Sequence, residues 1–382
     1  MLYQLSYPVG PSIIKRQGEA CLGSMRVMRD SAKKTGLGFA EAERNSSAEV
    51  VVIAEIGVNH DGDAEVAGRL IEAAAEAGAD AVKFQYFHAD RLLSNQAALA
   101  GYQAGQAKSQ RELLSRLALP IDVLSGLVEA AKGCGLAAVV TPFSLDDPRE
   151  LAGLGLDAIK TASPDAVNTP LLEACAALGL PMLISTGTCT LDELEPAAGL
   201  LRGHDAGGAM LHCVSSYPTP MNAAQLGGIV AMRSALGLAV GYSDHTPGLT
   251  TGALAVAAGA VVIEKHLTHD RAAKGPDHAA SLDPTQMKQY VANVREAQAA
   301  LGRIVKEVSD VEKDVRRVSR QSVCVVRDLP AGHVLSGEDL AVKRPGTGVA
   351  ASDLSAVIGK RLANAVRAND LLQADDLVEK LA

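Results

Sequence analysis

The sequence predicts an α/β protein built on a parallel (β/α)8 barrel, with a smaller domain appended after it. Three observations carry this prediction. Short apolar runs alternate with Ala- and Leu-rich stretches of helical period, eight such runs occur, and the alternation stops near residue 302. Strands that alternate with helices run parallel, and eight such units close into a barrel. A chain of 382 residues is too long for one ordinary core, so a second domain is expected.

The eight apolar runs are expected to form the barrel strands because they have strand length and are rich in aliphatic residues. They are VVIAEIG (51–57), AVKFQ (81–85), AAVVTPF (137–143), AIKTAS (158–163), PMLISTG (181–187), AMLHCV (209–214), LAVGYSD (238–244) and VVIEKHL (261–267). Their spacing is regular except over 86–136, where extra residues follow the second run. An insertion on such a loop is typical of a substrate lid.

The two ends of the chain are expected to lie outside the barrel. Residues 1–47 have mixed charge and no long apolar core, which predicts a loose N-terminal extension rather than a signal peptide. The barrel is predicted over 48–301 and a charged linker or helix over 302–320. Short strands and turns predict the second domain over 321–382.

Composition narrows the class of protein. A hydrophobic content of 48% with 21% charged residues is typical of a globular protein, and the longest apolar stretches have only strand length, so no membrane span is expected. A net charge of −8 argues against a nucleic-acid binder. The six cysteines are scattered without a CxxC spacing, which predicts reduced thiols and a cytoplasmic protein.

Polar residues end every one of the eight runs. The last run is the clearest case, since a buried strand rarely ends in Glu-Lys-His unless those charges have a use. In barrels of this kind the active site lies at the carboxyl ends of the strands. The polar strand ends are Glu55, Lys83, Gln85, Thr141, Lys160, Ser163, Ser185, Thr186, His212, Ser215, Ser243, Asp244, His245, Glu264, Lys265 and His266. Their convergence predicts a functional site.

Two histidines at neighbouring strand ends indicate a metal site. His245 and His266 could approach one another, and two neutral imidazoles suit a divalent ion such as Mn²⁺, with Glu55 or water completing the shell. Hydrogen-bonded packing is the alternative for a lone pair of histidines. The adjacent carboxylates of Asp244 and Glu264 favour the metal, as ligands or as partners of ligands.

Two lysines at strand ends indicate a phosphate site. The ammonium groups of Lys83 and Lys160 could neutralise an anion whose oxygens are held by hydroxyl groups. The hydroxyl groups nearby are those of Thr141, Ser163 and Ser243. Lysines in such places also permit Schiff-base chemistry, and this alternative stays open.

Nine motifs in order resemble the sialic acid synthase family, whose members include neuraminate, legionaminate, pseudaminate and spore-coat polysaccharide synthases. They are AEIGVNHDG (54–62), AGADAVKFQ (77–85), TPF (141–143), IKTAS (159–163), ISTG (184–187), LHCVSSYPTP (211–220), GYSDHT (241–246), EKHLTHDRAAKGPDH (264–278) and VKRPGTG (342–348). The resemblance covers about 48–380. It implies a TIM barrel followed by an antifreeze-like domain of the β-clip type, in a domain-swapped homodimer.

The resemblance also implies a reaction and the residues that perform it. An enzyme of this family condenses phosphoenolpyruvate with an N-acylated hexosamine and releases phosphate and a nine-carbon 2-keto acid. The matching motifs imply that His245 and His266 bind the metal, Mn²⁺ or Mg²⁺. Phosphoenolpyruvate falls to Lys83, Thr141, Lys160, Ser163, Ser215 and Ser243, and the sugar to Gln85, Tyr217, Asp277 and Arg344. Glu55 and Asp165 match acid/base or sugar-orienting carboxylates.

Three positions of the sequence depart from the family pattern. Ser-Pro-Asp (163–165) stands where many neuraminate synthases have Ser-Gly-Glu, Ser215 replaces an asparagine, and Thr188 follows STG where methionine is frequent. A non-catalytic sugar-binding barrel is a different class of function. It gives no reason to keep Glu55, both lysines and both histidines together.

Overall fold

The computed structural model describes residues 49–97, 109–302 and 305–378, and the predicted N-terminal extension lies outside these ranges. The chain divides into two compact units, Met1–Ile304 and Val305–Ala382. Each unit is described by itself.

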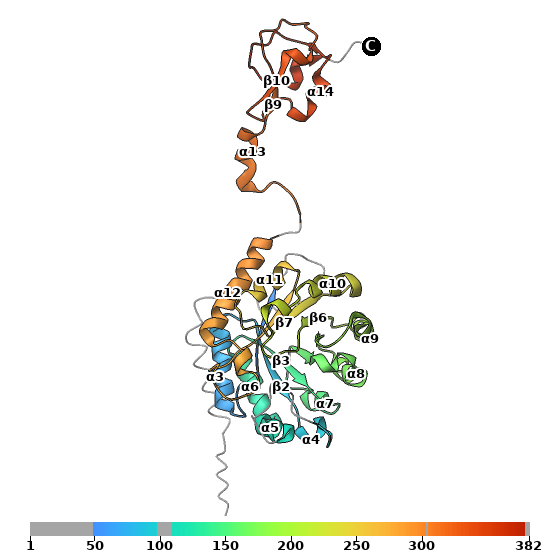
Figure 1. Cartoon of the computed structure of the whole chain (residues 1–382), viewed down its shortest axis with the longest axis vertical. Coiled ribbons are helices and arrows are strands. Elements are labelled where there is room, and N and C mark those ends of the chain that lie inside the picture. The colour runs from blue at the N-terminus through green and yellow to red at the C-terminus, as the bar shows by residue number, and fades with distance from the viewer. Residues whose placement is uncertain (1–48, 98–108, 303–304, 379–382) are drawn as a thin grey trace, which may run out of the picture. The chain divides into compact units, whose positions relative to one another are not determined.

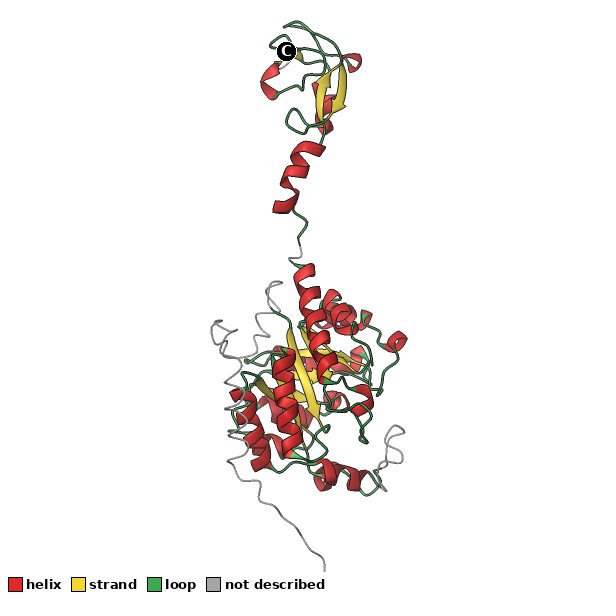
Figure 2. Ribbon diagram, turned by 90° about the vertical axis from the view of Figure 1, so that its left-hand side faces the viewer, coloured by secondary structure: helices red, strands yellow, loops and turns green. Residues whose placement is uncertain are grey.

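The first unit contains a closed barrel of eight parallel strands in sequential order (Figures 1 and 2). The strands are β1 (Val51–Gly57), β2 (Ala81–Tyr86), β3 (Ala137–Pro142), β4 (Ala158–Thr161), β5 (Met182–Ser185), β6 (Gly208–Cys213), β7 (Val240–Asp244) and β8 (Val262–His266). Pairing of β8 with β1 closes the barrel, with His266 opposite Glu55. All eight predicted runs are therefore strands.

Helices follow every strand and surround the barrel (Figure 2). They are α3 (Ala64–Ala77) after β1, α6 (Ile121–Gly133) after β2, α7 (Asp147–Leu151), α8 (Thr169–Ala176), α9 (Leu191–Arg202), α10 (Gly227–Leu236), α11 (Thr251–Ala257) and α12 (Pro284–Leu301). The insertion after β2 adds α4 (Ala89–Leu92) and α5 (Gln110–Leu117). Leu113 and Leu117 of α5 pack on Val58 and Phe87, so the described part of the insertion has its own small core beside β1 and β2.

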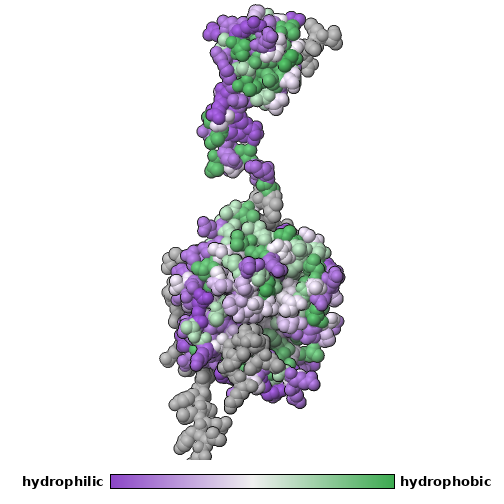
Figure 3. Space-filling view, in the orientation of Figure 1, coloured by the Kyte–Doolittle hydropathy of each residue, from purple (hydrophilic) through white to green (hydrophobic). Residues whose placement is uncertain are grey.

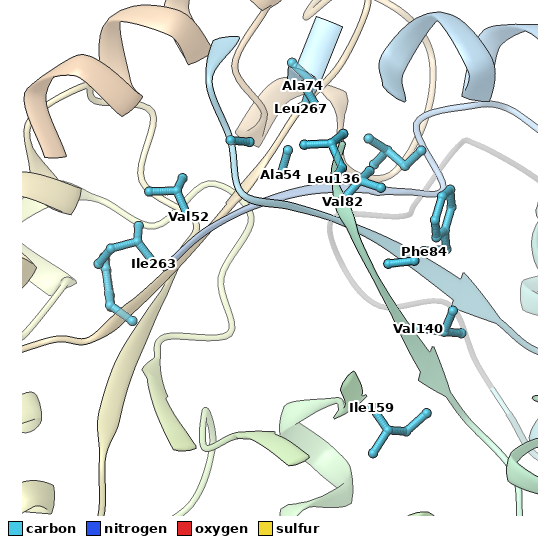
Figure 4. Close-up of a cluster of buried hydrophobic side chains, with 14 of the residues drawn as sticks. Val52, Ala54, Ala74, Val82, Phe84, Leu136, Val140, Ile159, Ile263 and Leu267 are labelled. Carbon is cyan, nitrogen blue, oxygen red and sulfur yellow. The ribbon is translucent and has the colours of Figure 1, made fainter. Parts of the chain in front are cut away.

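Alternation along each strand produces two separate apolar layers. Successive side chains of a strand point to opposite faces. Outward residues such as Val52, Val82 and Ile263 pack against the helices in the main core (Figure 4). Inward residues form a second cluster inside the barrel: Ile53, Ala81, Val139, Ala158, Leu183, Ala209, Leu211, Ala239 and Val262. This inner layer lies directly beneath the polar strand ends.

Local signals set the helix boundaries. Asp63 accepts hydrogen bonds from the amides of Glu65 and Val66 at 2.7 and 3.2 Å, which caps the start of α3. Gly78 ends the same helix with φ +83°, a conformation that glycine adopts without steric cost. At α12 a capping box between Asp283 and Gln286 marks the first turn.

The second unit is small and built from short antiparallel pairs. Strand β9 (Ser322–Val325) pairs with β10 (Leu340–Lys343), and β11 (Arg361–Leu362) pairs with β12 (Leu377–Val378). Their core includes Val323, Val325, Leu335, Leu362 and Leu372. The segment predicted as a charged linker or helix contains α13 (Lys313–Ser319).

Among the described helices, none is long and apolar enough to cross a membrane. The five described cysteines are all free thiols.

Candidate active site

Strand alternation builds a buried polar layer at the carboxyl ends of the barrel strands. Most of its members lie two residues after an apolar residue of the inner layer, and therefore on the same inward face. This layer comprises Glu55, Lys83, Thr141, Lys160, Ser185, Cys213, Ser243 and Glu264, all of them buried. The same periodicity that fills the barrel with apolar side chains thus places charged groups at its end.

The lysine cluster is the part of this layer formed by Glu55, Lys83, Gln85, Thr141, Lys160, Ser185, Ser243 and Glu264. Lys83 Nζ lies 2.8 Å from Glu55 Oε2 and 3.8 Å from Glu264 Oε1, and it donates to Thr141 Oγ1 at 3.1 Å. Lys160 Nζ lies 3.5 Å from Glu264 Oε2 and donates to Ser185 Oγ at 2.6 Å. Glu264 therefore bridges the two lysines.

Hydrogen bonds from neutral groups complete the lysine cluster. Ser243 Oγ donates to Glu264 Oε1 at 3.0 Å, and Gln85 Nε2 donates to Glu55 Oε1 at 2.8 Å. Gly57 makes room for the last pair, since a Cβ there would lie 2.3 Å from Glu55 Oε1 and 2.6 Å from Gln85 Nε2. The backbone at Gly57 has φ +35°, where the register between β1 and β2 shifts. Glycine is therefore required at this position on two counts.

The two carboxylates of the lysine cluster have pKa values shifted in opposite directions. Burial raises the pKa of Glu55, the charge of Glu264 adds to this, and Lys83 opposes it. Burial would also raise the pKa of Glu264, but Lys160 and Lys83 outweigh burial and hold it at about 2. Divergent pKa values in neighbouring carboxyl groups separate acid/base roles from purely electrostatic ones. Glu55 is thus suited to proton transfer, and Glu264 to remaining an anion.

The two lysines also differ. Burial would lower the pKa of Lys83, but the charges of Glu264 and Glu55 outweigh it and raise that pKa above its ordinary value. Burial lowers the pKa of Lys160, and the neighbouring charge of Lys83 adds to this effect against the attraction of Glu264. With both carboxylates ionised the two lysines are neutralised. A proton on Glu55 leaves one positive charge for an incoming anion.

The histidine cluster consists of Cys213, Tyr217, His245, His266 and Asp277. The rings of His245 and His266 lie 5.3 Å apart between centroids, and the ring of Tyr217 lies 4.1 Å from that of His245. His245 Nδ1 lies 3.0 Å from the carbonyl oxygen of Val214, which can only accept. The Nδ1 atom of His245 therefore carries a proton, and in the neutral form of the ring its Nε2 atom has a free lone pair. Burial would lower the pKa of His245, but Cys213 and the Val214 carbonyl group outweigh burial and raise it.

His266 and Asp277 face each other without a hydrogen bond. His266 Nδ1 lies 3.7 Å from Asp277 Oδ2, and this buried nitrogen has no hydrogen-bond partner among the described residues. Burial raises the pKa of Asp277 to about 6, with a further contribution from Glu55. Burial, together with the charge of His245, lowers the pKa of His266 well below its ordinary value. His266 is therefore a neutral imidazole near pH 7.

The histidine cluster is suited to a divalent metal ion that takes only two of its ligands from the protein. It offers a lone pair on His245 and an unpartnered nitrogen on His266, both in buried rings. Within the described ranges no group of three or more His, Cys, Asp or Glu residues could hold a metal ion. A labile ion that takes its remaining ligands from water or substrate oxygens suits such a pair.

Three small polar side chains converge around Gly187, just beyond β5. A Cβ on Gly187 would lie 2.3 Å from Ser215 Oγ and 2.9 Å from Ser163 Oγ. Ser163 Oγ accepts a hydrogen bond from the Gly187 amide at 3.0 Å and contacts Cys213 Sγ at 3.5 Å. Cys213 Sγ in turn lies 3.7 Å from His245 Nδ1. These serines therefore lie beside the histidine cluster.

A cavity of about 460 Å³ opens between the loops that follow β5 and β6. Its lining includes Thr186, Thr188, Cys189, His212, Cys213, Ser215 and Gln225. It therefore adjoins both the serines around Gly187 and the histidine cluster.

Within the barrel unit, one predicted site residue is not joined to these clusters by any contact among the described residues. Asp165, half-buried after β4, accepts from Asn168 Nδ2 at 3.0 Å, and burial raises its pKa. Arg344 is an exposed residue of the second unit, next to Pro345. Their proposed contacts with the sugar remain predictions.

Glu264 and Asp244, which the sequence predicts as ligands or as partners of ligands beside the histidines, make their direct contacts with lysines in the structure. Glu264 binds the two lysines. Asp244 points to the opposite face of β7 and pairs with Lys265 at 3.2 Å. Ser185, which received no role, is a hydrogen-bond acceptor for Lys160. The alternation of side chains along β7 and β8 was the signal that could have separated these faces.

Fold and site together define a barrel enzyme with a buried, charge-bearing pocket at the carboxyl ends of its strands. The profile of the NeuB family matches residues 70–306, and that of the SAF domain matches residues 320–378. The N,N'-diacetyllegionaminic acid synthase of Legionella pneumophila is 41% identical over 327 residues, which cover 84% of this chain and 92% of that protein.

Two solved structures show the same architecture. The N-acetylneuraminic acid (sialic acid) synthetase of Leptospira borgpetersenii aligns with a TM-score of 0.64 and 33% identity over 70% of this chain and 90% of that one. The "putative spore coat polysaccharide biosynthesis protein E" of Chromobacterium violaceum aligns with a TM-score of 0.75 and 26% identity over 87% of this chain and 100% of that one.

The chain therefore belongs to the NeuB family. It is an enzyme of the phosphoenolpyruvate-dependent, carbon–carbon bond-forming class that this family comprises. The predicted fold, a (β/α)8 barrel followed by an antifreeze-like domain, is confirmed.

Proposed function

We propose that this enzyme is a nonulosonic acid synthase, which condenses phosphoenolpyruvate with an N-acylated hexosamine to form a nine-carbon 2-keto acid and phosphate. The observation that carries the proposal is the presence of a buried lysine cluster and a buried histidine cluster at the same end of one barrel. The lysine cluster suits an anion, and the histidine cluster suits a metal ion. The relatives named as legionaminic and neuraminic acid synthases support the product class.

In this proposal the lysine cluster binds phosphoenolpyruvate. Lys83 and Lys160 are buried, so their attraction for an anion is little screened by solvent. The hydroxyl groups of Thr141 and Ser243 lie within the cluster, and those of Ser163 and Ser215 lie around Gly187. Together these groups provide donors for the phosphate and carboxylate oxygens.

The histidine cluster would hold a divalent ion, Mn²⁺ or Mg²⁺, through His245 and His266. Such an ion supplies Lewis acidity toward the aldehyde oxygen of the open-chain sugar. Asp277 and Tyr217 lie against the two imidazoles and are placed to orient the sugar hydroxyl groups, with Gln85 on the side of Glu55.

The reaction forms one bond to carbon at each of two centres and breaks one carbon–oxygen bond. C3 of phosphoenolpyruvate attacks the aldehyde carbon, and the electron pair of the enol double bond becomes the new C–C bond. The aldehyde oxygen takes up a proton, and water adds to the cationic C2. The resulting tetrahedral centre expels phosphate by C–O cleavage and leaves the 2-keto acid.

The chain's own carboxylates act at the cationic centre. Glu264, held ionised between the lysines, stabilises positive charge at C2. Glu55, protonated because of its raised pKa, gives that proton to the aldehyde oxygen and, once ionised, accepts one from the attacking water. Asp165 is a second candidate for orienting the sugar, from the 3₁₀ turn after β4.

A Schiff-base aldolase is the second candidate function, because burial lowers the pKa of Lys160 and so favours a nucleophilic amine. One assay separates the two. The enzyme is incubated with phosphoenolpyruvate, Mn²⁺ and a panel of N-acylated hexosamines, and phosphate release is measured alongside product mass. The proposal expects phosphate and a 2-keto acid in equal amounts, and full loss of turnover in excess chelator. Activity in chelator, with covalent trapping of substrate by borohydride, would establish the lysine chemistry instead.

The second unit contributes Arg344, and we propose that it does so in a domain-swapped cytoplasmic homodimer. Around α13 the apolar residues Val308, Val311, Val315 and Val318 recur at helical spacing and are exposed, Val311 to 88%. Figure 3 shows hydrophobic surface among the hydrophilic residues of this segment. An exposed apolar stripe of this kind is typical of a helix that packs on a partner. A second copy of the chain would cover it.

Subunit complementation tests this arrangement. Arg344→Ala and His266→Ala proteins are mixed after subunit exchange. In a swapped heterodimer one of the two sites retains both residues, so part of the activity should return. A control mixture of Arg344→Ala with wild-type barrel truncated after Gly302 should regain no activity, because neither chain supplies Arg344. No recovery in verified heterodimers would exclude a shared site.

A further inference from the structure

Behind the histidine cluster, on the outward face of β7 and β8, lies a second buried charge pair. Asp244 Oδ2 lies 3.2 Å from Lys265 Nζ, and both side chains have no solvent exposure. The two residues are register partners on the last rung of the β7–β8 ladder. Each directly precedes a histidine of the site. Burying two charges is costly, so a pair with no part in binding calls for an explanation.

Besides its ion pair with Lys265, the Asp244 carboxylate accepts hydrogen bonds from residues of α11, α12, β7 and the turn after β7. Tyr290 of α12 donates to Asp244 Oδ2 at 2.7 Å, and Thr251 of α11 donates to the same oxygen at 2.6 Å. The amide of Thr246 donates to Asp244 Oδ1 at 2.8 Å, and Tyr242 donates to Oδ1 at 3.3 Å. The carboxylate is therefore held rigidly with respect to the outer helices.

The charge pair binds the backbone of Thr246, the residue that follows His245. Asp244 binds the Thr246 amide, and Lys265 Nζ donates to the Thr246 carbonyl oxygen. Both backbone groups of Thr246 are thus held by the pair, and His245 is enclosed between two fixed residues. This matters because β7 ends at Asp244, so that His245 lies beyond the strand.

His266, in contrast, lies within its strand and is fixed by strand pairing. It is the last residue of β8 and is paired in register with Glu55 of β1. The carbonyl oxygens of both histidines accept a backbone hydrogen bond at 2.9 Å, that of His266 from Leu282 and that of His245 from Thr219, so only the strand pairing differs. The strand ladder therefore fixes His266, while His245 depends on its bond with Thr219 and on the charge pair.

We propose that the Asp244–Lys265 pair, braced by Tyr290, is a positioning device that holds His245 with its Nδ1–H on the Val214 carbonyl and its Nε2 toward the site. The inference rests on the proposed binding role of His245 and His266. Neither Asp244 nor Lys265 contacts substrate in this account. Their effect passes through the backbone of Thr246 and the orientation of one imidazole.

The test uses three variants of the full chain: Lys265→Met, Asp244→Asn and Tyr290→Phe. Two properties are measured, the affinity for Mn²⁺ by calorimetry and the tautomer of His245 by ¹⁵N-histidine spectroscopy of the metal-free protein. His245→Gln assigns the His245 signal among the nine histidines. We expect Mn²⁺ affinity to fall by about tenfold in Lys265→Met, as for other residues that orient metal ligands, and by less in Tyr290→Phe. The single Nδ1–H form of His245 should give way to a mixture.

Asp80→Asn is the matched control. Asp80 accepts from the Val52 amide at 2.7 Å and pairs with Arg295, but it precedes β2 at the other end of the barrel. Its loss should lower the melting temperature without changing Mn²⁺ affinity or the His245 tautomer. Phosphoenolpyruvate affinity, measured without metal, should also be unchanged in all the variants.

The outcomes separate cleanly. Unchanged tautomer and Mn²⁺ affinity in the folded variants would overturn the inference, as would parallel losses of Mn²⁺ and phosphoenolpyruvate binding. If Lys265→Met does not fold, Tyr290→Phe decides, because it keeps both charges and the aromatic ring. A wild-type enzyme that binds no Mn²⁺ would contradict the proposed metal role, while the tautomer measurement would still decide the positioning role.

Discussion

The lysine cluster and the histidine cluster lie at the same end of the barrel, yet they are built in opposite ways. Every charge of the lysine cluster lies opposite a charge of the other sign, and Glu264 links both ammonium groups, although Glu55 Oε2 and Glu264 Oε2 make no hydrogen bond within the described residues. The histidine cluster has an unpartnered buried nitrogen on His266 and a free lone pair on His245. A cluster of paired charges binds a ligand by exchanging ion-pair partners, whereas imidazole nitrogens with free lone pairs gain a partner when the ligand binds. The two clusters should therefore respond differently to mutation.

The largest effect is expected at the unsatisfied cluster. His266→Ala removes one of only two protein ligands for the proposed ion, so turnover should fall by more than about a hundredfold, beyond the loss typical of residues that merely support a ligand. Phosphoenolpyruvate affinity should change little, because Lys83 and Lys160 keep their contacts. Steady-state kinetics and calorimetry measure the two quantities.

His204→Ala is the control for the loss of an imidazole. His204 lies after α9, where its Nε2 contacts the Leu180 carbonyl oxygen at 2.7 Å, and its replacement should leave turnover intact. Equal losses in His204→Ala and His266→Ala would remove the distinction between the clusters.

A smaller and different effect is expected at the paired cluster. Lys160→Met removes a buried charge worth roughly 2–5 kcal/mol to an anion, so phosphoenolpyruvate affinity should fall at least about tenfold. Mn²⁺ affinity should be retained. Lys132→Met, which removes an exposed lysine that binds Gly155, provides the control. Calorimetry that finds wild-type phosphoenolpyruvate affinity in Lys160→Met would show that the anion binds elsewhere.

Much of this contrast could be predicted from the sequence, because it follows from local pattern. The eight apolar runs fix the strands, and alternation places Glu55, Lys83 and Lys160 on the inner face, two residues beyond apolar ones. Alternation also separates the three polar residues that end β8. Glu264 and His266 point into the barrel, and Lys265 points outward.

The partners of these charges could not be predicted in this way. The assignment of Glu264 to two lysines depends on strands β2, β4 and β8 meeting inside a closed barrel. The Asp244–Lys265 pair is braced by Tyr290 of α12, which binds Asp244 and lies 46 positions from it in the chain. Long-range packing decides both, and strand periodicity carries no information about it. Arg344, exposed on the second unit, carries no signal beyond the resemblance of its motif.

Asp277 gives the histidine cluster a pH-dependent stability that the metal-free protein should reveal. Its folded pKa of about 6 lies above the ordinary value of 3.8. Between pH 4 and 6 the folded state therefore holds a proton that the unfolded state has lost, so stability falls as pH rises through this window. The difference, about 2 pKa units, corresponds to about 3 kcal/mol above pH 6.

Asp277→Asn should remove this dependence. Relative to wild type, the variant should gain up to about 3 kcal/mol in unfolding free energy between pH 4 and pH 7, measured by urea titration in chelator. Parallel pH profiles for the two proteins would mean that Asp277 ionises at an ordinary pKa and is better solvated than its burial indicates.

The smallest effect is expected from a neutral partner within the paired cluster. Ser185→Ala removes the hydroxyl that accepts from Lys160 Nζ at 2.6 Å, but Glu264 still lies 3.5 Å from the same nitrogen. A buried ammonium that loses one of its acceptors should cost about 1–2 kcal/mol of unfolding free energy. Phosphoenolpyruvate affinity should fall much less than in Lys160→Met, because the charge remains and the ligand itself supplies an acceptor. Measuring both variants by calorimetry and urea unfolding separates the charge from its positioning. If Ser185→Ala weakens binding as much as Lys160→Met does, the orientation of the ammonium group outweighs its charge, and full pairing would be a requirement of binding rather than of folding.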